Sequence, residues 1–424
     1  MEAPKIIDDF YVFKARAMWS YFKGQHFSFW MMCCYLFFEF VRPQAIFPAM
    51  DFLPWAQLFI LGALVGAFMD PTVRHVQSSA NVYVIAFSLL IIISIFTAYN
   101  PVVAKNKFMD FFSWVIIYFV IVRIINTKER FYIFLLIFLF AAGKIAIGTS
   151  KSWAFRGFSF SGWGLSGPKG FFQNSGELAI LMVMLFPLAF YLYQHLKTKA
   201  ALWERLILIA FWVCPILTVL GASSRGAQIA LAVVMVIMFR KSILKIKPLI
   251  GVVILVVGLI YLLPEEQKER FRNTGDDKTS QQRLLYWENG WEMMLDHPLT
   301  GVGFFNFIPY FNHYYSGDVL YKDKGAELPH NIFIQVGTDA GFPALLFFIL
   351  IIIYCLRATY KVSRAATNSM LEKSIAAGLG MGIFGYVIAG QFVTVAYYPF
   401  LWIHLACIVS LTNSFRVKER INEI

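Results

Sequence analysis

Arg225 lies where a positive charge is costly, between two long apolar segments of the sequence, residues 206–220 and 229–239. The residues next to it are small or polar and read Gly-Ala-Ser-Ser before it and Gly-Ala-Gln after it. An arginine inside or at the edge of a membrane generally has a partner or a function, because its charge is expensive to remove from water. Arg225 therefore indicates that an anion is held at a membrane surface.

Two further side chains with suitable chemistry lie in or beside a long polar segment, residues 264–329. Arg283 stands near the start of a run with one apolar stripe, residues 281–295, which predicts a helix lying in the membrane interface. His330 follows Pro329 at the mouth of the next apolar segment. A neutral imidazole there could take a proton from a hydroxyl near neutral pH, although a single histidine at a helix start is also a common structural residue.

Residues 150–175 form a second polar segment that could face an anion. It mixes Arg156 and Lys169 with glycines and aromatics and ends at Asn174, a good N-cap for the helix that follows. The N-terminus of a helix offers backbone N–H groups to an anion. The segment is thus either a substrate-binding loop, with Arg156, Lys169 and Asn174 as candidate residues, or a flexible loop in the membrane interface.

The elements that must position these residues are transmembrane helices. Of the 424 residues 59% are hydrophobic and 18% aromatic, including 44 Phe, well above the roughly 45–50% apolar share of soluble domains. The composition predicts an all-α polytopic membrane protein, and apolar runs near the ~20 residues that a spanning helix needs recur along the chain. About twelve spans are expected, at residues 27–41, 53–69, 80–98, 108–125, 131–149, 176–195, 204–221, 226–240, 247–263, 331–356, 375–396 and 399–414.

The basic residues set the expected orientation. With the N-terminus in the cytoplasm, 22 of the 37 Lys and Arg residues fall on cytoplasmic segments, as the positive-inside rule requires. Both termini are then cytoplasmic and Arg225 faces outward. The formal charge of +12 thus indicates contact with membrane lipids rather than with nucleic acid. The expected organisation is helices one to nine in residues 1–263, an outer loop domain containing helices in 264–329, and helices ten to twelve in 330–424.

Four motifs in this order resemble the O-antigen ligase family, which also includes O-antigen polymerases and protein O-oligosaccharyltransferases. They are Ser-Ser-Arg-Gly at 223–226, the helix that contains Arg283, His-Pro-Leu-Thr-Gly-Val-Gly at 297–303, and Pro-His-Asn at 329–331 followed by Gly-Phe-Pro at 341–343. The resemblance is strongest over residues 148–356, whereas the first five helices match in hydropathy alone.

The resemblance implies a C-type glycosyltransferase architecture in the bacterial inner membrane with its active site facing the periplasm. Such enzymes transfer a preassembled glycan from undecaprenyl diphosphate, the ligases to a sugar of the lipid A core, in an inverting reaction regarded as metal-independent. Arg225 and Arg283 are then expected to bind the diphosphate, both by position and by likeness to the family's arginines, and His330 to activate the acceptor hydroxyl. No metal or other cofactor is expected, since the outer face holds no Asp-x-Asp or paired His motif.

Other functions stay open at this stage. A polymerase or a protein O-oligosaccharyltransferase could use the same Arg and His chemistry with a different acceptor. A secondary transporter would be expected to show internal repeats and midplane charges, and the sequence shows no such repeat while its candidate charges gather outside. Lipopolysaccharide biosynthesis through ligation to lipid A core is the first expectation.

Overall fold

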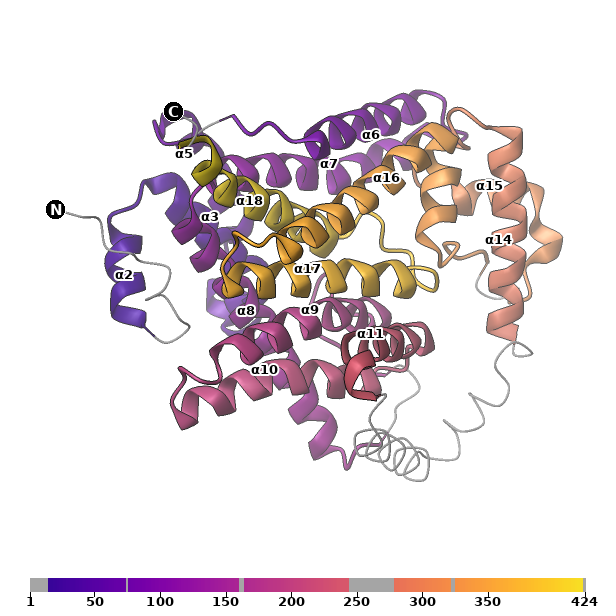
Figure 1. Cartoon of the computed structure of the whole chain (residues 1–424). Helices are drawn as coiled ribbons and strands as arrows, with labels where there is room; N and C mark the ends of the chain where they lie inside the picture. Colours follow the sequence, from indigo (N-terminus) through magenta and orange to yellow (C-terminus); the bar gives the residue numbers. More distant parts are fainter. Residues whose placement is uncertain (1–13, 74, 160–163, 244–277, 322–324, 422–424) are drawn as a thin grey trace.

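The computed structural model describes residues 14–73, 75–159, 164–243, 278–321 and 325–421. The chain is 77% helical, with no strand in the part described, so the predicted all-α class is confirmed (Figure 1). The helices are α2 (Ala15–Lys23), α3 (Phe27–Val41), α4 (Pro43–Ile46), η1 (Pro48–Met50), α5 (Trp55–Met69), α6 (Ser79–Phe96), α7 (Pro101–Ile124), α8 (Lys128–Phe155), α9 (Ser175–Leu196), α10 (Leu202–Gly221), α11 (Arg225–Ile243), α14 (Lys278–Asp296), α15 (Phe307–Tyr314), η2 (Ser316–Asp318), α16 (Ile332–Arg364), α17 (Met370–Ala389) and α18 (Pro399–Ile421).

Eleven of the twelve expected spans coincide with helices, and the remaining one, 247–263, lies outside the described residues. Within the described residues, six helices are long and apolar enough to cross a membrane, α6, α8, α9, α10, α16 and α17, and two shorter apolar stretches lie in α5 and α18. The protein therefore has the features of a multi-pass membrane protein, while the count of twelve crossings stays a prediction. The helix expected over residues 281–295 is present as part of α14, while its place in the membrane interface stays a prediction.

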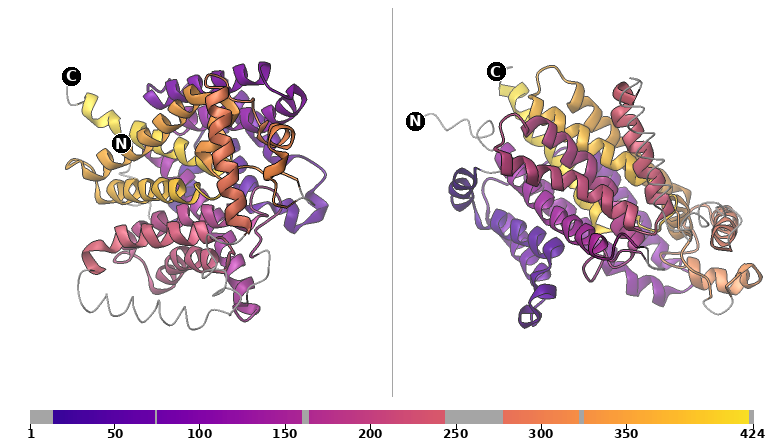
Figure 2. Two further views of the ribbon diagram at one scale, coloured as in Figure 1. Left: turned by 90° about the vertical axis from the view of Figure 1, so that its right-hand side faces the viewer. Right: turned by 90° about the horizontal axis from the view of Figure 1, so that it is seen from below.

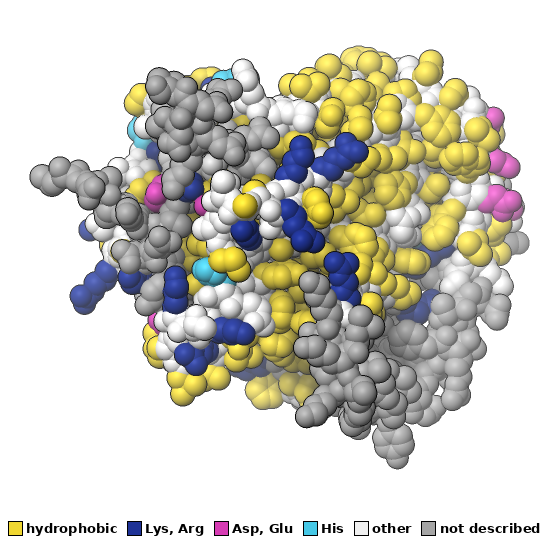
Figure 3. All heavy atoms as spheres, in the orientation of Figure 1, with side chains coloured by type: hydrophobic (Ala, Val, Ile, Leu, Met, Phe, Trp, Pro, Cys, Tyr) yellow, Lys and Arg dark blue, Asp and Glu magenta, His cyan; other side chains and the backbone are white. Residues whose placement is uncertain are grey.

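α6 shows which surface faces lipid. Its exposed side chains are large and apolar and recur every three or four residues, whereas its other face is buried against the bundle. An exposed apolar stripe of this kind is unfavourable in water and is the normal surface of a membrane helix. The stripe consists of Val82, Ile85, Leu89, Ile93 and Phe96. Hydrophobic side chains also cover a broad part of the face in Figure 3.

The two ends of the bundle differ in what they carry. α2 and the end of α18 lie at one end, and α14 and α15 lie at the other (Figures 1 and 2). Helices α9 and α17 run along the bundle in close contact. Their closeness shows at Gly378, where an added Cβ atom would lie only 2.6 Å from Leu188 Cα. Small residues at such a position allow two helices to approach closely. α9 begins, and α17 ends, beside the candidate active site.

α16 is kinked within its first half. Ala340 and Gly341 depart from helical geometry, with φ 76° at Gly341, and Pro343 follows. The kink brings the backbone of α16 against residues 298–301. A side chain at position 341 would clash with the backbone there, so glycine is required. Residues 298–305 are thereby held between α16 and the rest of the bundle.

Candidate active site

A cavity of about 1590 Å³ opens at the end of the bundle that carries α14 and α15. Its wall is formed by α7, α9, α11, α14, α15, α16 and the segment that joins α17 to α18. Arg225, Arg283, His330 and Asn174 all lie on this wall. The structure thus brings together four of the six site residues expected from the sequence. Their chemical roles remain proposals.

Arg225 is the first residue of α11, and hydrogen bonds hold the segment before it in place. Gln228 donates hydrogen bonds from Nε2 to the backbone oxygens of Leu220 and Ala222, at 3.1 and 3.3 Å. These bonds join the end of α10 to the first turn of α11 and so fix the direction in which α11 begins. The first residues of α9, Ser175 and Gly176, line the same cavity. Two helix N-termini therefore meet there, and both favour negative charge.

The segment between α17 and α18 links three parts of the site through consecutive residues. A Cβ on Gly226 would overlap with Phe392, and a Cβ on Gly176 would lie 3.3 Å from Val393. Thr394 Oγ1 accepts a hydrogen bond of 2.9 Å from the backbone N–H of His330. One short stretch thus contacts the starts of α11 and α9 and the residue His330. This role was not predicted, because residues 392–394 lie within the apolar span expected at 375–396.

Arg283 lies on α14, which hydrogen bonds tie to the segment before His330. Trp287, one turn after Arg283, donates from Nε1 to the backbone oxygen of Pro329 at 2.8 Å. The Tyr286 hydroxyl accepts the backbone N–H of Glu327 at 2.8 Å. Because Pro329 and Glu327 lie one and three residues before His330, these bonds tie the helix that carries Arg283 to the histidine. A side cavity of about 240 Å³ is lined by Arg283, Glu327 and His330 together.

His330 has geometry suited to accepting a proton. Its Nε2 lies 3.4 Å from Glu327 Oε2, and its side chain is 29% exposed, so a substrate hydroxyl can reach it. Since a carboxylate only accepts hydrogen bonds, this contact requires the proton on Nε2 and leaves Nδ1 able to take a proton. The backbone of His330 is left-handed, with φ 52°, a conformation that costs energy in a residue other than glycine.

Phe305 is a second cavity residue with left-handed backbone, at φ 54°. Its N–H donates a hydrogen bond of 2.9 Å to Oδ1 of Asp339, a buried carboxyl in α16 just before the kink. Only four non-glycine residues in the described part of the chain have positive φ, and two of them, Phe305 and His330, line this cavity. Backbone strain of this kind concentrates at functional sites.

Two expected residues lie elsewhere. Arg156 caps the end of α8 and is exposed, and Lys169 is exposed with its backbone oxygen accepting a hydrogen bond from Arg42. Neither lines the cavity. α8 itself continues to Phe155, into the segment predicted as a loop. Conversely, Lys107 lines the cavity although nothing in the sequence singled it out. In the described part of the chain, no three His, Cys, Asp or Glu side chains are grouped as metal ligands.

Two family models match the chain. Residues 209–349 match the O-antigen ligase family, which confirms the resemblance seen in the motifs. Residues 9–197 match a family of unknown function, DUF5935. No curated protein sequence matches the chain significantly. Arg225, Arg283 and His330 fall in the first match, and Asn174 and Lys107 fall in the second, so both matched regions contribute to one cavity.

Proposed function

We propose that this protein, whose residues 209–349 match the O-antigen ligase family, transfers a preassembled glycan from undecaprenyl diphosphate to an acceptor hydroxyl at the periplasmic face of the inner membrane. The observation that carries the proposal is the placement of Arg225, Arg283 and His330 on the wall of one cavity. The cavity is large enough for sugar rings and a diphosphate together, since ordinary ligand pockets measure roughly 300–1,000 Å³.

The two arginines bind the diphosphate in this proposal. As the bond from the anomeric carbon to the diphosphate oxygen breaks, negative charge grows on the leaving group, which keeps the bonding electrons. Fixed cations aimed at that charge lower the activation barrier. Removing one stabilising group of this kind typically lowers the rate by a factor of roughly 10²–10³. The first turn of α11, which carries no acidic residue, adds N–H groups of the same polarity.

His330 acts as the general base. The acceptor oxygen bonds to the anomeric carbon while its proton passes to Nδ1 of His330, and Glu327 holds the other ring nitrogen. Because the acceptor attacks on the face opposite the leaving diphosphate, a single displacement inverts the configuration. All the charges that this step needs are supplied by side chains of the protein, which is why we propose that it proceeds without a metal ion.

The acceptor that we propose is a sugar of the lipid A core, as in the ligases of the family. The test is reconstitution of the purified protein in lipid nanodiscs with an undecaprenyl-diphosphate-linked glycan and a chelator. Core lipid, a second lipid-linked glycan and a Ser/Thr peptide are supplied in separate reactions. Transfer to core lipid with chelator present is expected. Transfer only to the second lipid-linked glycan, or only to peptide, would replace the ligase assignment by a polymerase or a protein transferase, and a requirement for metal would reject the arginine-based mechanism.

A further inference from the structure

One side of the cavity differs in chemistry from the side that carries the arginines. It is formed by Lys107 and Asp110 of α7, by Phe171 and Glu177 around the start of α9, and by Tyr398 just before α18. We propose that this side, called here the acidic-aromatic wall, is a subsite for a sugar ring of the substrates. The inference rests on the proposed function and deepens it, because it says where the glycan is recognised and by which part of the chain.

Glu177 is the centre of the wall. Its Oε1 accepts a hydrogen bond of 2.5 Å from the Tyr398 hydroxyl, which fixes the carboxylate, while the side chain stays partly exposed in the cavity. A fixed carboxylate is a strong acceptor for hydroxyl groups, and a sugar presents several hydroxyls within one ring. Asp110 adds a second carboxylate, 3.4 Å from Lys107, whose ammonium can donate to a sugar oxygen in turn.

The aromatic rings supply the apolar part of the wall. Phe171 and Tyr398 are both half-buried and meet edge to face, with ring centroids 5.7 Å apart. The buried Trp114 supports Phe171 from behind at 5.3 Å. Sugar rings combine polar edges with apolar C–H faces, and a site of flat apolar surface with a few placed polar groups matches both.

The wall and the two arginines suit different parts of a substrate. Arg225 and Arg283 attract a diphosphate, whereas Glu177 and Asp110, the latter paired with Lys107, offer acceptors for hydroxyl groups. A substrate that carries a sugar at one end and a diphosphate at the other therefore has one preferred orientation in the cavity. Four of the five wall residues lie within residues 9–197, which gives the matched family of unknown function a role in selecting the glycan.

A purely structural role for Glu177 is the alternative that the test must separate. Glu177 is the third residue of α9, the position from which a glutamate can accept the backbone N–H of the N-cap residue, here Asn174. Glu204 has the same place in α10, where its Oε2 accepts the backbone N–H of Ala201 at 2.6 Å, and it does not line the cavity. Glutamine serves in such caps as well as glutamate does. Glu177→Gln and Glu204→Gln thus form a matched pair.

The experiment uses the full chain in nanodiscs and two probes, undecaprenyl diphosphate and the same lipid carrying one N-acetylglucosamine. The added sugar is expected to tighten binding to the wild-type protein by about tenfold, the size of one charge-assisted hydrogen bond. Glu177→Gln and Phe171→Ala should remove most of that gain and leave binding of the sugar-free lipid unchanged. Glu204→Gln and Phe52→Ala, which replace residues away from the cavity, should retain it.

A second arm identifies the source of the sugar. In the transfer assay at saturating donor, an increase in the acceptor KM of Glu177→Gln without a change in donor binding would assign the wall to the acceptor sugar. The inference is overturned if Glu177→Gln matches Glu204→Gln in both donor binding and acceptor KM. Failure of the wild-type protein to bind either lipid would instead overturn the proposed donor, and this inference with it.

Discussion

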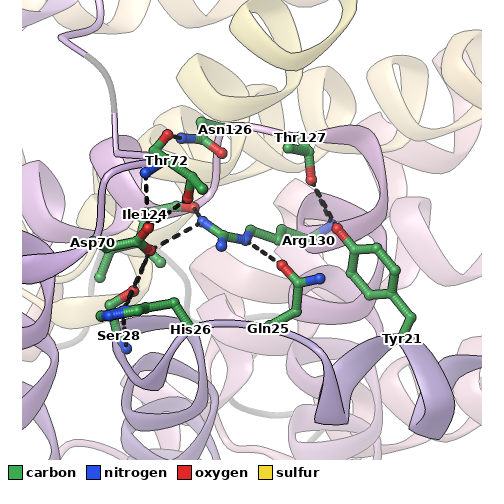
Figure 4. A network of polar contacts seen from close by, with 10 residues as sticks. All are labelled: Tyr21, Gln25, His26, Ser28, Asp70, Thr72, Ile124, Asn126, Thr127 and Arg130. Carbon is green, nitrogen blue, oxygen red and sulfur yellow. Dashed lines mark hydrogen bonds and ion pairs between the residues drawn. The ribbon is translucent and has the colours of Figure 1, made fainter.

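Arg130 and Arg225 both lie in the first turn of a helix, α8 and α11 respectively, yet their surroundings differ. Arg130 is 3% exposed and is enclosed at the end of the bundle near α2 (Figure 4). Its guanidinium donates to Gln25 and to the backbone oxygen of Ile124 and lies 3.5 Å from Asp70. Arg225 lines a large cavity at the other end. The same residue type is thus built into the interior at one end and presented to a possible ligand at the other.

The difference shows how an arginine's function can be read from its surroundings. A cation in the first turn of a helix is opposed by the helix dipole, so both sites gain from an anion. At Arg130 the anion is Asp70, which also accepts hydrogen bonds from Ser28 and Thr72 at 2.7 and 2.6 Å. At Arg225 we propose that the anion is a diphosphate. Substitutions at the enclosed end should lower stability, and substitutions at the cavity should lower binding or turnover.

The largest effect is expected from His330→Ala. Loss of a general base typically costs about 10²–10⁴ in rate, so kcat should fall about 10³-fold with little change in donor affinity. His313→Ala, an exposed histidine outside the cavity, is the control and should keep wild-type turnover. Measurement of kcat in the reconstituted transfer reaction checks the prediction. Equal loss in both variants would remove His330 from the mechanism.

Arg130→Ala should give the largest loss of stability. Removing one partner of a buried ion pair costs about 3–5 kcal/mol, and the lower end is expected because Ser28 and Thr72 still hydrogen-bond to Asp70. Thermal and SDS unfolding in detergent measure this loss. The fraction that remains folded should bind donor with wild-type affinity. Weakened binding by that fraction would contradict the division between an enclosed end and a substrate end.

Acidification should act on the hydrogen-bonded group formed by Arg130, Asp70, Ser28 and Thr72. Burial raises the pKa of Asp70, but hydrogen bonds from Thr72 and Ser28 and the charge of Arg130 outweigh it, so the pKa is lowered overall. The contribution of Asp70 to stability is therefore present above the unfolded pKa of about 3.9 and is lost as pH falls through the lower folded value. Melting temperature followed from pH 6 downward should decline less steeply in Asp70→Asn than in the wild type. Parallel curves would show that Asp70 is not the titrating group.

Glu327→Gln is expected to have the smallest effect. The Glu327 side chain is 57% exposed, and its contact with His330 is 3.4 Å. Exposed pairs contribute about 0.2–1 kcal/mol, so kcat should fall at most about fivefold, with KM unchanged. The amide oxygen of glutamine still accepts a hydrogen bond from Nε2. A loss as large as that of His330→Ala would mean that Glu327 itself takes the proton.

The helices were predictable from the sequence because each apolar run is a local signal. The runs at 80–98 and 204–221 correspond closely to α6 and α10. The spacing around Trp287 and Trp291 likewise predicted α14. Arg225 was recognisable as a candidate because a cation between apolar runs is rare for a physical reason that one sequence shows.

The assembly of the site could not be predicted in the same way. Contacts from Phe392 to Gly226 and from Thr394 to His330 join residues far apart in the chain, and nothing in the local pattern of residues 392–394 indicates them. Lys107 lies at the edge of an apolar run, where a lysine is unremarkable. Arg156 and Lys169 were selected by charge and loop context, and neither lines the cavity in the folded chain.

The most direct test of the account is binding of undecaprenyl diphosphate to nanodisc-embedded wild type, Arg225→Ala, Arg283→Ala and His330→Ala, each first shown to be folded. Loss of a bidentate phosphate contact should cost about 1.5–3 kcal/mol. Both arginine variants should therefore bind roughly 10- to 100-fold more weakly, while His330→Ala should stay within about threefold of the wild type. Unchanged affinity in both arginine variants would contradict the account, because the cavity would then hold something other than the diphosphate.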